Sequence, residues 1–150
     1  MINYTRGDLL ADNAEVLVNT VNCVGVMGKG LALAFRQAFP VNYKLYRAAC
    51  AAGEVRPGKL FIVSDFNLFY GPKLIINFPT KTDWRKPSRY DYVESGLETL
   101  VGHLNANPVA TLALPALGCG NGGLDWGRVK GMIEHHLKDL PVAMSVYEPV

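Results

Sequence analysis

Val21-Asn22-Cys23-Val24-Gly25-Val26-Met27-Gly28-Lys29-Gly30 is a glycine-rich segment that follows the apolar run Val16-Leu17-Val18. A second such segment, Gly118-Cys119-Gly120-Asn121-Gly122-Gly123, follows the apolar run Thr111-Leu112-Ala113-Leu114. Glycines at this density let backbone N–H groups approach a ligand with no Cβ in the way, and clustered N–H donors suit phosphate oxygens. The two segments together predict a cradle for two phosphates, and hence a ligand that contains a diphosphate.

The elements around these segments alternate between strands and helices. Apolar runs predict strands over residues 2–4, 15–19, 59–64, 73–78, 111–114 and 143–147. Helical spacing predicts helices over residues 31–39, 42–52, 93–104 and 126–140, the first of them stopped by Pro40. This alternation is typical of a three-layer α/β/α domain with a central mixed sheet. Ligands of such sheets bind at the carboxyl ends of the strands, which both glycine segments follow.

Size and composition are those of one ordinary globular domain over residues 1–150. The chain is 49% apolar and 19% charged, with a formal net charge of +2. No apolar run approaches the length of a membrane span, and the first residues lack the layout of a signal peptide. The three cysteines are an odd number without CxxC spacing, which favours a reduced, cytoplasmic protein that does not act at a membrane.

Two nucleotide-binding motifs match only partly. Gly118-x-Gly120-x-x-Gly123 fits GxGxxG, but that fingerprint belongs in the first βαβ unit, with an acidic residue about 20 positions later. Gly28-Lys29-Gly30 lacks the Ser or Thr that follows the lysine in a Walker A loop. Both a Rossmann domain and an NTPase are therefore disfavoured.

Metal and thiol chemistry are also disfavoured. His135 and His136 are adjacent on one predicted helix and His103 lies on another, so we expect no metal site and no cofactor. Cys23 and Cys119 lie inside the glycine segments, where a nucleophile is conceivable. Because no histidine is near them in sequence, we interpret them as small buried loop residues.

The ordered set of motifs resembles the macrodomain family. It consists of Gly7-Asp8, the segment from Val18 to Gly30, and Gly118-Cys119-Gly120-Asn121-Gly122-Gly123-Leu124-Asp125-Trp126. The resemblance covers essentially the whole chain. It implies the macrodomain fold and ADP-ribose as the ligand, which supplies the diphosphate.

The resemblance also implies individual roles. Asp8 would accept a hydrogen bond from the adenine amino group beside the Leu9 backbone, and a turn aspartate after Gly7 is the plain alternative. Asn22 would bind the distal ribose, and Tyr147 would pack either on the adenine or in the core. The residues assigned to ADP-ribose are Asp8, Leu9, Thr20, Val21, Asn22, Gly28, Lys29, Gly30, Leu31, Thr80, Leu117, Gly118, Cys119, Gly120, Asn121 and Gly122.

The tract Asn77-Phe78-Pro79-Thr80-Lys81-Thr82-Asp83-Trp84-Arg85 resembles one branch of the family, which contains terminal ADP-ribose protein glycohydrolase and the DarG antitoxins. That branch has a catalytic lysine at the distal ribose, and Lys81 matches it. A lysine shielded from water can have a lowered pKa and act as a neutral nucleophile, with Asn22 orienting the ribose. A surface lysine in a basic loop is the plain alternative.

The chain departs from the protein-directed relative at one position. That relative has a catalytic aspartate inside the second glycine segment, where Gly122 stands here. Asp125, three residues later, is interpreted as the N-cap of the helix that begins at Trp126. Hydrolysis of a glutamate ester is therefore a weaker prediction than hydrolysis of another ADP-ribosyl linkage.

The segment from Lys81 to Tyr90 contains four basic residues, against Asp83 alone, together with Trp84. Cations suit phosphates and aromatic rings stack on unpaired bases, although a solvated loop has the same composition. The DarG resemblance implies removal of ADP-ribose from thymidine in single-stranded DNA, in opposition to a DarT-like toxin. The chain would then be one domain of a longer antitoxin. The alternatives are hydrolysis at protein glutamate and a reader that binds ADP-ribose without turnover.

Overall fold

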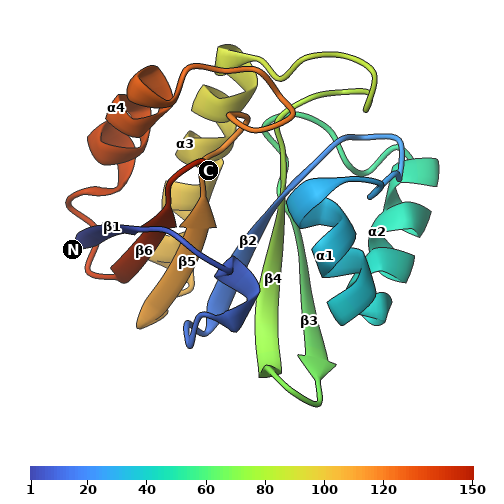
Figure 1. Cartoon of the computed structure of the whole chain (residues 1–150), viewed down its shortest axis with the longest axis horizontal. Coiled ribbons are helices and arrows are strands. Elements are labelled where there is room, and N and C mark those ends of the chain that lie inside the picture. The colour runs from blue at the N-terminus through green and yellow to red at the C-terminus, as the bar shows by residue number, and fades with distance from the viewer.

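A six-stranded sheet forms the centre of the computed structural model, which describes residues 1–150 (Figure 1). The strand order is β1-β6-β5-β2-β4-β3. Every neighbouring pair is parallel except β3 and β4, which are antiparallel, so the sheet is mixed as predicted. The strands are β1 (Ile2–Thr5), β2 (Val16–Val21), β3 (Phe61–Asn67), β4 (Gly71–Pro79), β5 (Thr111–Pro115) and β6 (Ala143–Tyr147).

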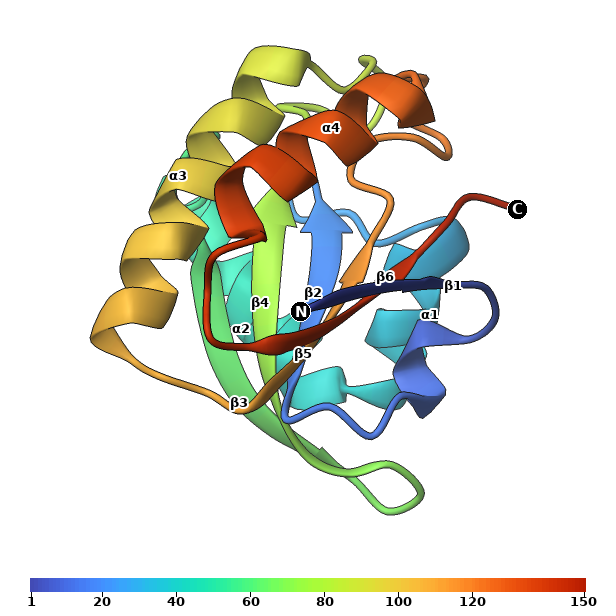
Figure 2. The same cartoon turned by 90° about the vertical axis from the view of Figure 1, so that its left-hand side faces the viewer.

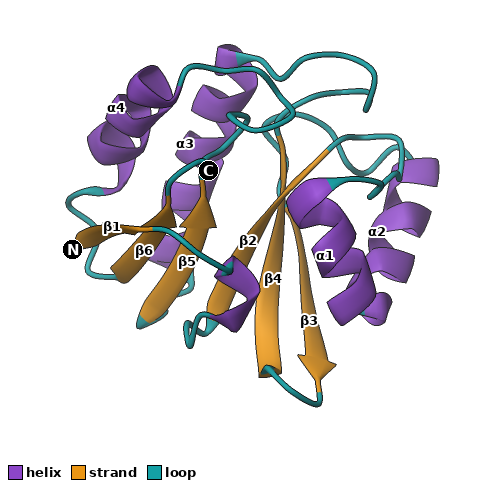
Figure 3. Ribbon diagram, in the orientation of Figure 1, coloured by secondary structure: helices purple, strands orange, loops and turns teal.

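Helices cover both faces of this sheet, which confirms the three-layer prediction (Figures 2 and 3). One face carries α3 (Tyr90–Ala106) and α4 (Trp126–Leu137), and the other carries α1 (Gly30–Ala38) and α2 (Pro40–Ala51). The 3-10 helix η1 (Leu9–Ala11) lies on the α1 side and was not predicted. No helix is both long enough and apolar enough to span a membrane.

The central strand β2 is buried from both sides. Val16 and Val18 pack into the cluster that includes α3 and α4, whereas Leu17 packs with Phe35 of α1 and with η1. Leu17 and Val18 are both 0% exposed. Burial on two faces explains why this strand reads as a continuous apolar run.

Most elements differ from their predicted bounds by a few residues, and three of these differences have a clear physical reason. Pro40 does not merely stop the first helix, because it is also the first residue of α2, where its missing N–H costs no hydrogen bond. The last helix ends at Leu137, so Leu140 lies outside it. β3 begins two residues later than predicted and continues to Asn67, since its pairing with β4 extends through Asp65, Phe66 and Asn67.

The sheet pairing changes at β2, where both glycine segments converge. β2 pairs with β4 along its whole length, but with β5 only at Val16↔Leu112 and Leu17↔Ala113. β2 and β5 therefore separate toward their carboxyl ends, as Figure 1 shows. This is the position in an open α/β sheet where a ligand is expected.

Candidate functional site

The two glycine segments face each other at the carboxyl ends of β2 and β5. A Cβ built on Gly30 would lie 3.3 Å from Nδ2 of Asn121, so the segments are in contact there. The backbone N–H groups of Gly120, Asn121 and Gly122 donate to no protein acceptor. α1 begins at Gly30 without a side-chain cap from Lys29, so its first N–H groups are free as well. The two segments therefore present facing sets of free backbone donors, which is the arrangement that the predicted phosphate cradle requires.

Asn22 shapes the first glycine segment from inside. Its Oδ1 accepts hydrogen bonds from the N–H groups of Val24 (3.1 Å) and Val26 (3.4 Å), and its Nδ2 donates to the Val26 carbonyl oxygen (2.7 Å). The buried hydroxyl of Tyr46 also donates to Oδ1 (2.9 Å) and to the Asn22 carbonyl oxygen (2.8 Å). Asn22 therefore fixes the loop conformation through its side chain. The contribution of Tyr46 has no sequence signal, because it depends on where α2 packs.

Lys81 lies in the turn after β4, against the first glycine segment. The Thr80 N–H donates to the Val21 carbonyl oxygen (3.1 Å), and the Cys23 N–H donates to the Thr82 carbonyl oxygen (3.0 Å). The Lys81 side chain is partly buried. This burial lowers the pKa of its ammonium, and the positive charge of Lys29 lowers it further. The direction is the one that a nucleophilic amine requires.

Ser88 ties the Lys81 turn to the second glycine segment. Its Oγ donates to Oγ1 of Thr80 (3.0 Å), and its N–H donates to the Gly122 carbonyl oxygen (3.0 Å). The Arg89 N–H also donates to the Thr80 carbonyl oxygen (3.1 Å). Ser88 is 4% exposed. No sequence pattern selects this serine, because it joins the turn after β4 to the second glycine segment, which is distant in the chain.

Close packing around Gly122 leaves no room for a side chain at this position. A Cβ at this position would overlap Oγ of Ser88 and the carbonyl oxygen of Gly118. An aspartate, such as the protein-directed relative has in this segment, does not fit here without a backbone shift. Asp125 is the N-cap of α4, as predicted, because its carboxylate accepts a 3.0 Å hydrogen bond from the Arg128 N–H.

The two loop cysteines are half-buried. Cys23 Sγ donates to the Lys81 carbonyl oxygen (3.5 Å), and Cys119 Sγ donates to the Leu117 carbonyl oxygen (3.4 Å). Burial raises the pKa of each thiol to about 11. Both thiols are therefore protonated at neutral pH, which agrees with their interpretation as packing residues.

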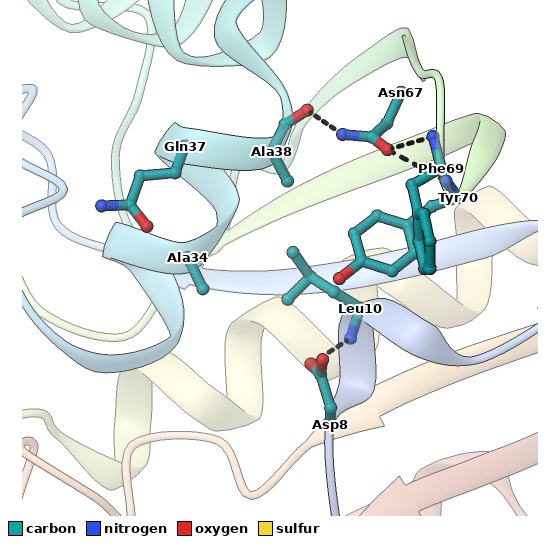
Figure 4. A pocket seen from close by; sticks show the side chains of 8 residues that line it. All are labelled: Asp8, Leu10, Ala34, Gln37, Ala38, Asn67, Phe69 and Tyr70. Carbon is teal, nitrogen blue, oxygen red and sulfur yellow. Dashed lines mark hydrogen bonds between the residues drawn. The ribbon is translucent and has the colours of Figure 1, made fainter.

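Asp8 lies apart from the glycine segments, at the start of η1. Its Oδ1 accepts a 3.0 Å hydrogen bond from the Leu10 N–H, while Oδ2 has no protein donor. Asp8 lines a pocket of about 390 Å³, shown in Figure 4, between η1, α1 and the β3–β4 turn. The pocket is lined by Asp8, Leu10, Ala34, Gln37, Ala38, Asn67, Phe69 and Tyr70. Tyr147 is not among them, because its hydroxyl donates to Oδ2 of Asp12 (2.7 Å) and its ring packs against the α1-side core.

The other residues predicted to bind the ligand differ in their exposure to solvent. Leu9, Val21, Thr80 and Leu117 are at most 4% exposed as whole residues, so they present little surface to a ligand in this structure. Thr20, Leu31 and Cys119 are partly buried, and Gly28, Lys29, Gly30, Gly120 and Asn121 are exposed.

The basic loop carries less free charge than its composition suggests. Arg85 forms a two-point ion pair with Asp83, with distances of 2.9 Å and 2.8 Å. Arg89 pairs in the same way with Asp91. Lys86 has no ion-pair partner, and the Trp84 ring is 51% exposed. The chain contains no group of three His, Cys, Asp or Glu side chains that could hold a metal ion.

The sequence and the fold both match known proteins. The Macro domain family model matches residues 18–133, and this chain belongs to that family. Within the family, the solved macrodomain of Mycobacterium tuberculosis DarG superposes with a TM-score of 0.95 at 48% identity, covering 100% of this chain and 99% of that one. The resemblance to DarG macrodomains found in the sequence is confirmed.

Two longer relatives extend this match. A Thermus aquaticus protein named DNA ADP-ribosyl glycohydrolase is 51% identical over 151 residues. The alignment covers 100% of this chain, which spans 42% of that relative's length. The structure of Thermosipho africanus DarTG in complex with ADP-ribose has a TM-score of 0.91 at 32% identity, covering 99% of this chain and 42% of that one.

Proposed function

We propose that this macrodomain hydrolyses the bond between ADP-ribose and thymidine bases in single-stranded DNA. One observation carries the proposal: Lys81 is a partly buried lysine with a lowered pKa, in a turn that is hydrogen-bonded to the first glycine segment and joined by Ser88 to the second. The similarity to a DNA ADP-ribosyl glycohydrolase over the whole chain supports the same activity.

The proposed ligand is ADP-ribose, with its diphosphate between the facing glycine segments. The free N–H groups at Gly120, Asn121 and Gly122 and at the start of α1 would donate to the phosphate oxygens. The free Oδ2 of Asp8 would accept from the adenine amino group. The distal ribose would then lie near Asn22 and Lys81, whose turn is hydrogen-bonded to the first segment.

The proposed reaction begins with the neutral amine of Lys81. Its lone pair attacks the anomeric carbon of the distal ribose and forms a C–N bond, while the bond from that carbon to thymine breaks. The base leaves with the electron pair and takes up a proton that the lysine nitrogen releases. Opening of the sugar ring gives a Schiff base, which water hydrolyses to free ADP-ribose and the neutral lysine. No metal or cofactor takes part.

The choice of DNA over protein rests on Gly122 and on the loop after Lys81. The space beyond Gly122 is filled by Ser88, so the aspartate of the protein-directed relative has no counterpart. Lys86 and the exposed Trp84 ring offer a phosphate contact and a stacking surface for an unpaired strand. A reader without turnover would have no need of a lysine with a lowered pKa.

The proposed biological role is that of an antitoxin that opposes a DarT-like DNA ADP-ribosyltransferase. The longer relatives support this role, as does the Thermosipho africanus DarTG protein. We propose that residues 1–150 are the macrodomain of a longer antitoxin and that it acts on DNA in the cytoplasm.

The decisive experiment offers two substrates side by side. The protein is incubated with single-stranded DNA carrying ADP-ribosylated thymidine and with a protein carrying ADP-ribosylated glutamate, and the products are identified by mass spectrometry. We expect restored thymidine and free ADP-ribose from the DNA. Release from the glutamate alone would replace the proposal with the protein-directed activity, and release from neither would support a reader.

A further inference from the structure

The guanidinium of an arginine lies over a tyrosine ring beside the second glycine segment. Cζ of Arg128, in the first turn of α4, is 3.7 Å from the centre of the Tyr90 ring. Tyr90 is the first residue of α3, and its hydroxyl accepts a 3.0 Å hydrogen bond from the Asp125 N–H. The starts of α3 and α4 are therefore joined, and Arg128 is exposed at the junction.

This junction flanks the proposed reaction site. α3 starts directly after Ser88 and Arg89, which bind the Gly122 and Thr80 carbonyl oxygens. α4 starts directly after the second glycine segment. Figure 2 shows the beginnings of both helices at the end of the molecule toward which β2 and β4 point. A strand whose modified nucleotide occupies the site would pass close to this junction.

Three of the cations near the site are paired with carboxylates. Arg85 pairs with Asp83, Arg89 pairs with Asp91 of α3, and Nζ of Lys130 lies 4.0 Å from a Glu148 oxygen. Arg128 has no ion pair. The Asp125 carboxylate is engaged as the helix cap through the Arg128 backbone N–H.

The stacked geometry suits a phosphate. A guanidinium that rests one face on an aromatic ring keeps its N–H edge in plane and free for two phosphate oxygens. The ring also holds the side chain in one orientation, which reduces the entropy lost on binding. A cation in the first turn of a helix faces the positive end of the helix dipole, so an anion there relieves the repulsion.

We propose that Arg128, supported by Tyr90, binds a backbone phosphate of the single-stranded DNA next to the modified nucleotide. This inference rests on the proposed function, which it deepens by naming a second contact with the strand outside the β4–α3 loop. Lys86 and Arg128 then bind the strand from separate elements, the β4–α3 loop and α4.

The test is binding of an unmodified single-stranded oligonucleotide, measured by fluorescence anisotropy over a range of salt concentrations. Arg128→Gln should raise Kd about two- to fivefold at low salt, as expected for one exposed ion pair. It should also reduce the slope of log K against log salt by about 0.7, the contribution of one phosphate contact on a single strand. Tyr90→Leu should reproduce this loss, whereas Tyr90→Phe keeps the ring and should bind as the parent does.

Arg36 provides a matched control, because its Cζ lies 4.5 Å from the Tyr43 ring, near the opposite end of α1 from the glycine segment. Arg36→Gln should leave Kd and the salt slope unchanged. Equal behaviour of Arg128→Gln and Arg36→Gln, or no binding by the parent at low salt, would overturn the inference. Hydrolysis of ADP-ribosylated thymidine mononucleoside is measured separately. If the parent protein does not hydrolyse this mononucleoside, the proposed function is contradicted. The oligonucleotide binding data decide the role of Arg128 in either case.

Discussion

Lys81 is the residue on which the proposed chemistry depends. Lys81→Ala removes the amine but leaves both glycine segments and Asn22 in place. We expect the affinity for free ADP-ribose to change little and kcat to fall by about 100-fold or more, the contribution typical of a positioned catalytic group. Calorimetry measures the first quantity and release of ADP-ribose the second. Turnover at the parent rate would show that Lys81 is not the nucleophile, and borohydride trapping of the parent tests the Schiff base separately.

Lys29 adds to the effect of burial on the pKa of that amine. Its charge disfavours the ammonium form of Lys81 and so helps to lower the Lys81 pKa. Lys29→Met should therefore raise this pKa, and the rising limb of kcat against pH should move to higher pH. The measurement is made at saturating substrate, because Lys29 also belongs to the proposed binding surface. Lys44→Met, on the exposed part of α2, is the control, and a profile that shifts equally in both variants would refute the coupling.

For single residues, the sequence predicts which residues belong to the candidate site better than it predicts which residues they contact. The glycine segments, Asn22, Asp125 and Lys81 were identified from motifs, because each motif is local in the chain. Ser88 joins the turn after β4 to the distant second glycine segment, and no local pattern encodes its contact with Gly122. The Arg128–Tyr90 pair was missed for the same reason. The charge of the basic loop was overestimated, since Asp91 lies just beyond the segment considered.

Among the secondary elements, α3 packs on β4 through a glycine. A Cβ on Gly96 would overlap the ring of Phe78, which is 0% exposed, whereas a Cβ on Gly102 of the same helix meets nothing within 4 Å. Gly96→Ala should destabilise the fold by about 1–3 kcal/mol through overpacking. Gly102→Ala should stabilise it by about 0.5–1 kcal/mol through helix propensity. Urea denaturation of the two variants measures the difference, and equal effects would contradict this account of the helix–sheet contact.

The β4–α3 loop contains a paired and an unpaired cation that can be compared directly. Lys86→Glu should slow turnover of modified single-stranded DNA more than Arg85→Glu, because Arg85 is already paired with Asp83. The difference should be largest at low salt and absent with a modified mononucleoside. Rates of ADP-ribose release over a salt series provide the test, and a larger effect at Arg85 would mean that this ion pair opens for the strand.

The helices and strands themselves follow closely from apolar periodicity. The runs at β2, β5 and β6 and the stripe of α3 are long or regular enough to be read directly. η1 escaped detection because a single turn has no period. The polar end of β3 was missed because its pairing with β4, rather than its composition, makes it a strand. The strand order rests on long-range pairing, so apolar periodicity does not predict it.

For the whole molecule, binding of ADP-ribose should raise the free energy of unfolding. ADP-ribose at about 100 times its Kd should add about 2.7 kcal/mol to the free energy of unfolding. For a chain of this size that corresponds to a rise in Tm of about 5–10 °C. Gly120→Glu should abolish the rise by placing a carboxylate at the phosphate site. The variant should still fold, because a Cβ at Gly120 meets nothing within 4 Å. An unchanged Tm of the parent with saturating ADP-ribose would contradict the proposed ligand.

The fastening of Ser88 to both Thr80 and Gly122 has a consequence for inhibitors. A compound that displaces the second glycine segment also displaces the turn that carries Lys81, because one buried serine holds the two together. A diphosphate mimic that leaves the segment in place should also leave the Lys81 amine in its position. An electrophile attached at the proposed position of the distal ribose could then react with that amine. A bulkier replacement of the diphosphate would displace the segment and, with it, the Lys81 amine. Covalent ligands for this protein are therefore best built outward from an unaltered diphosphate mimic.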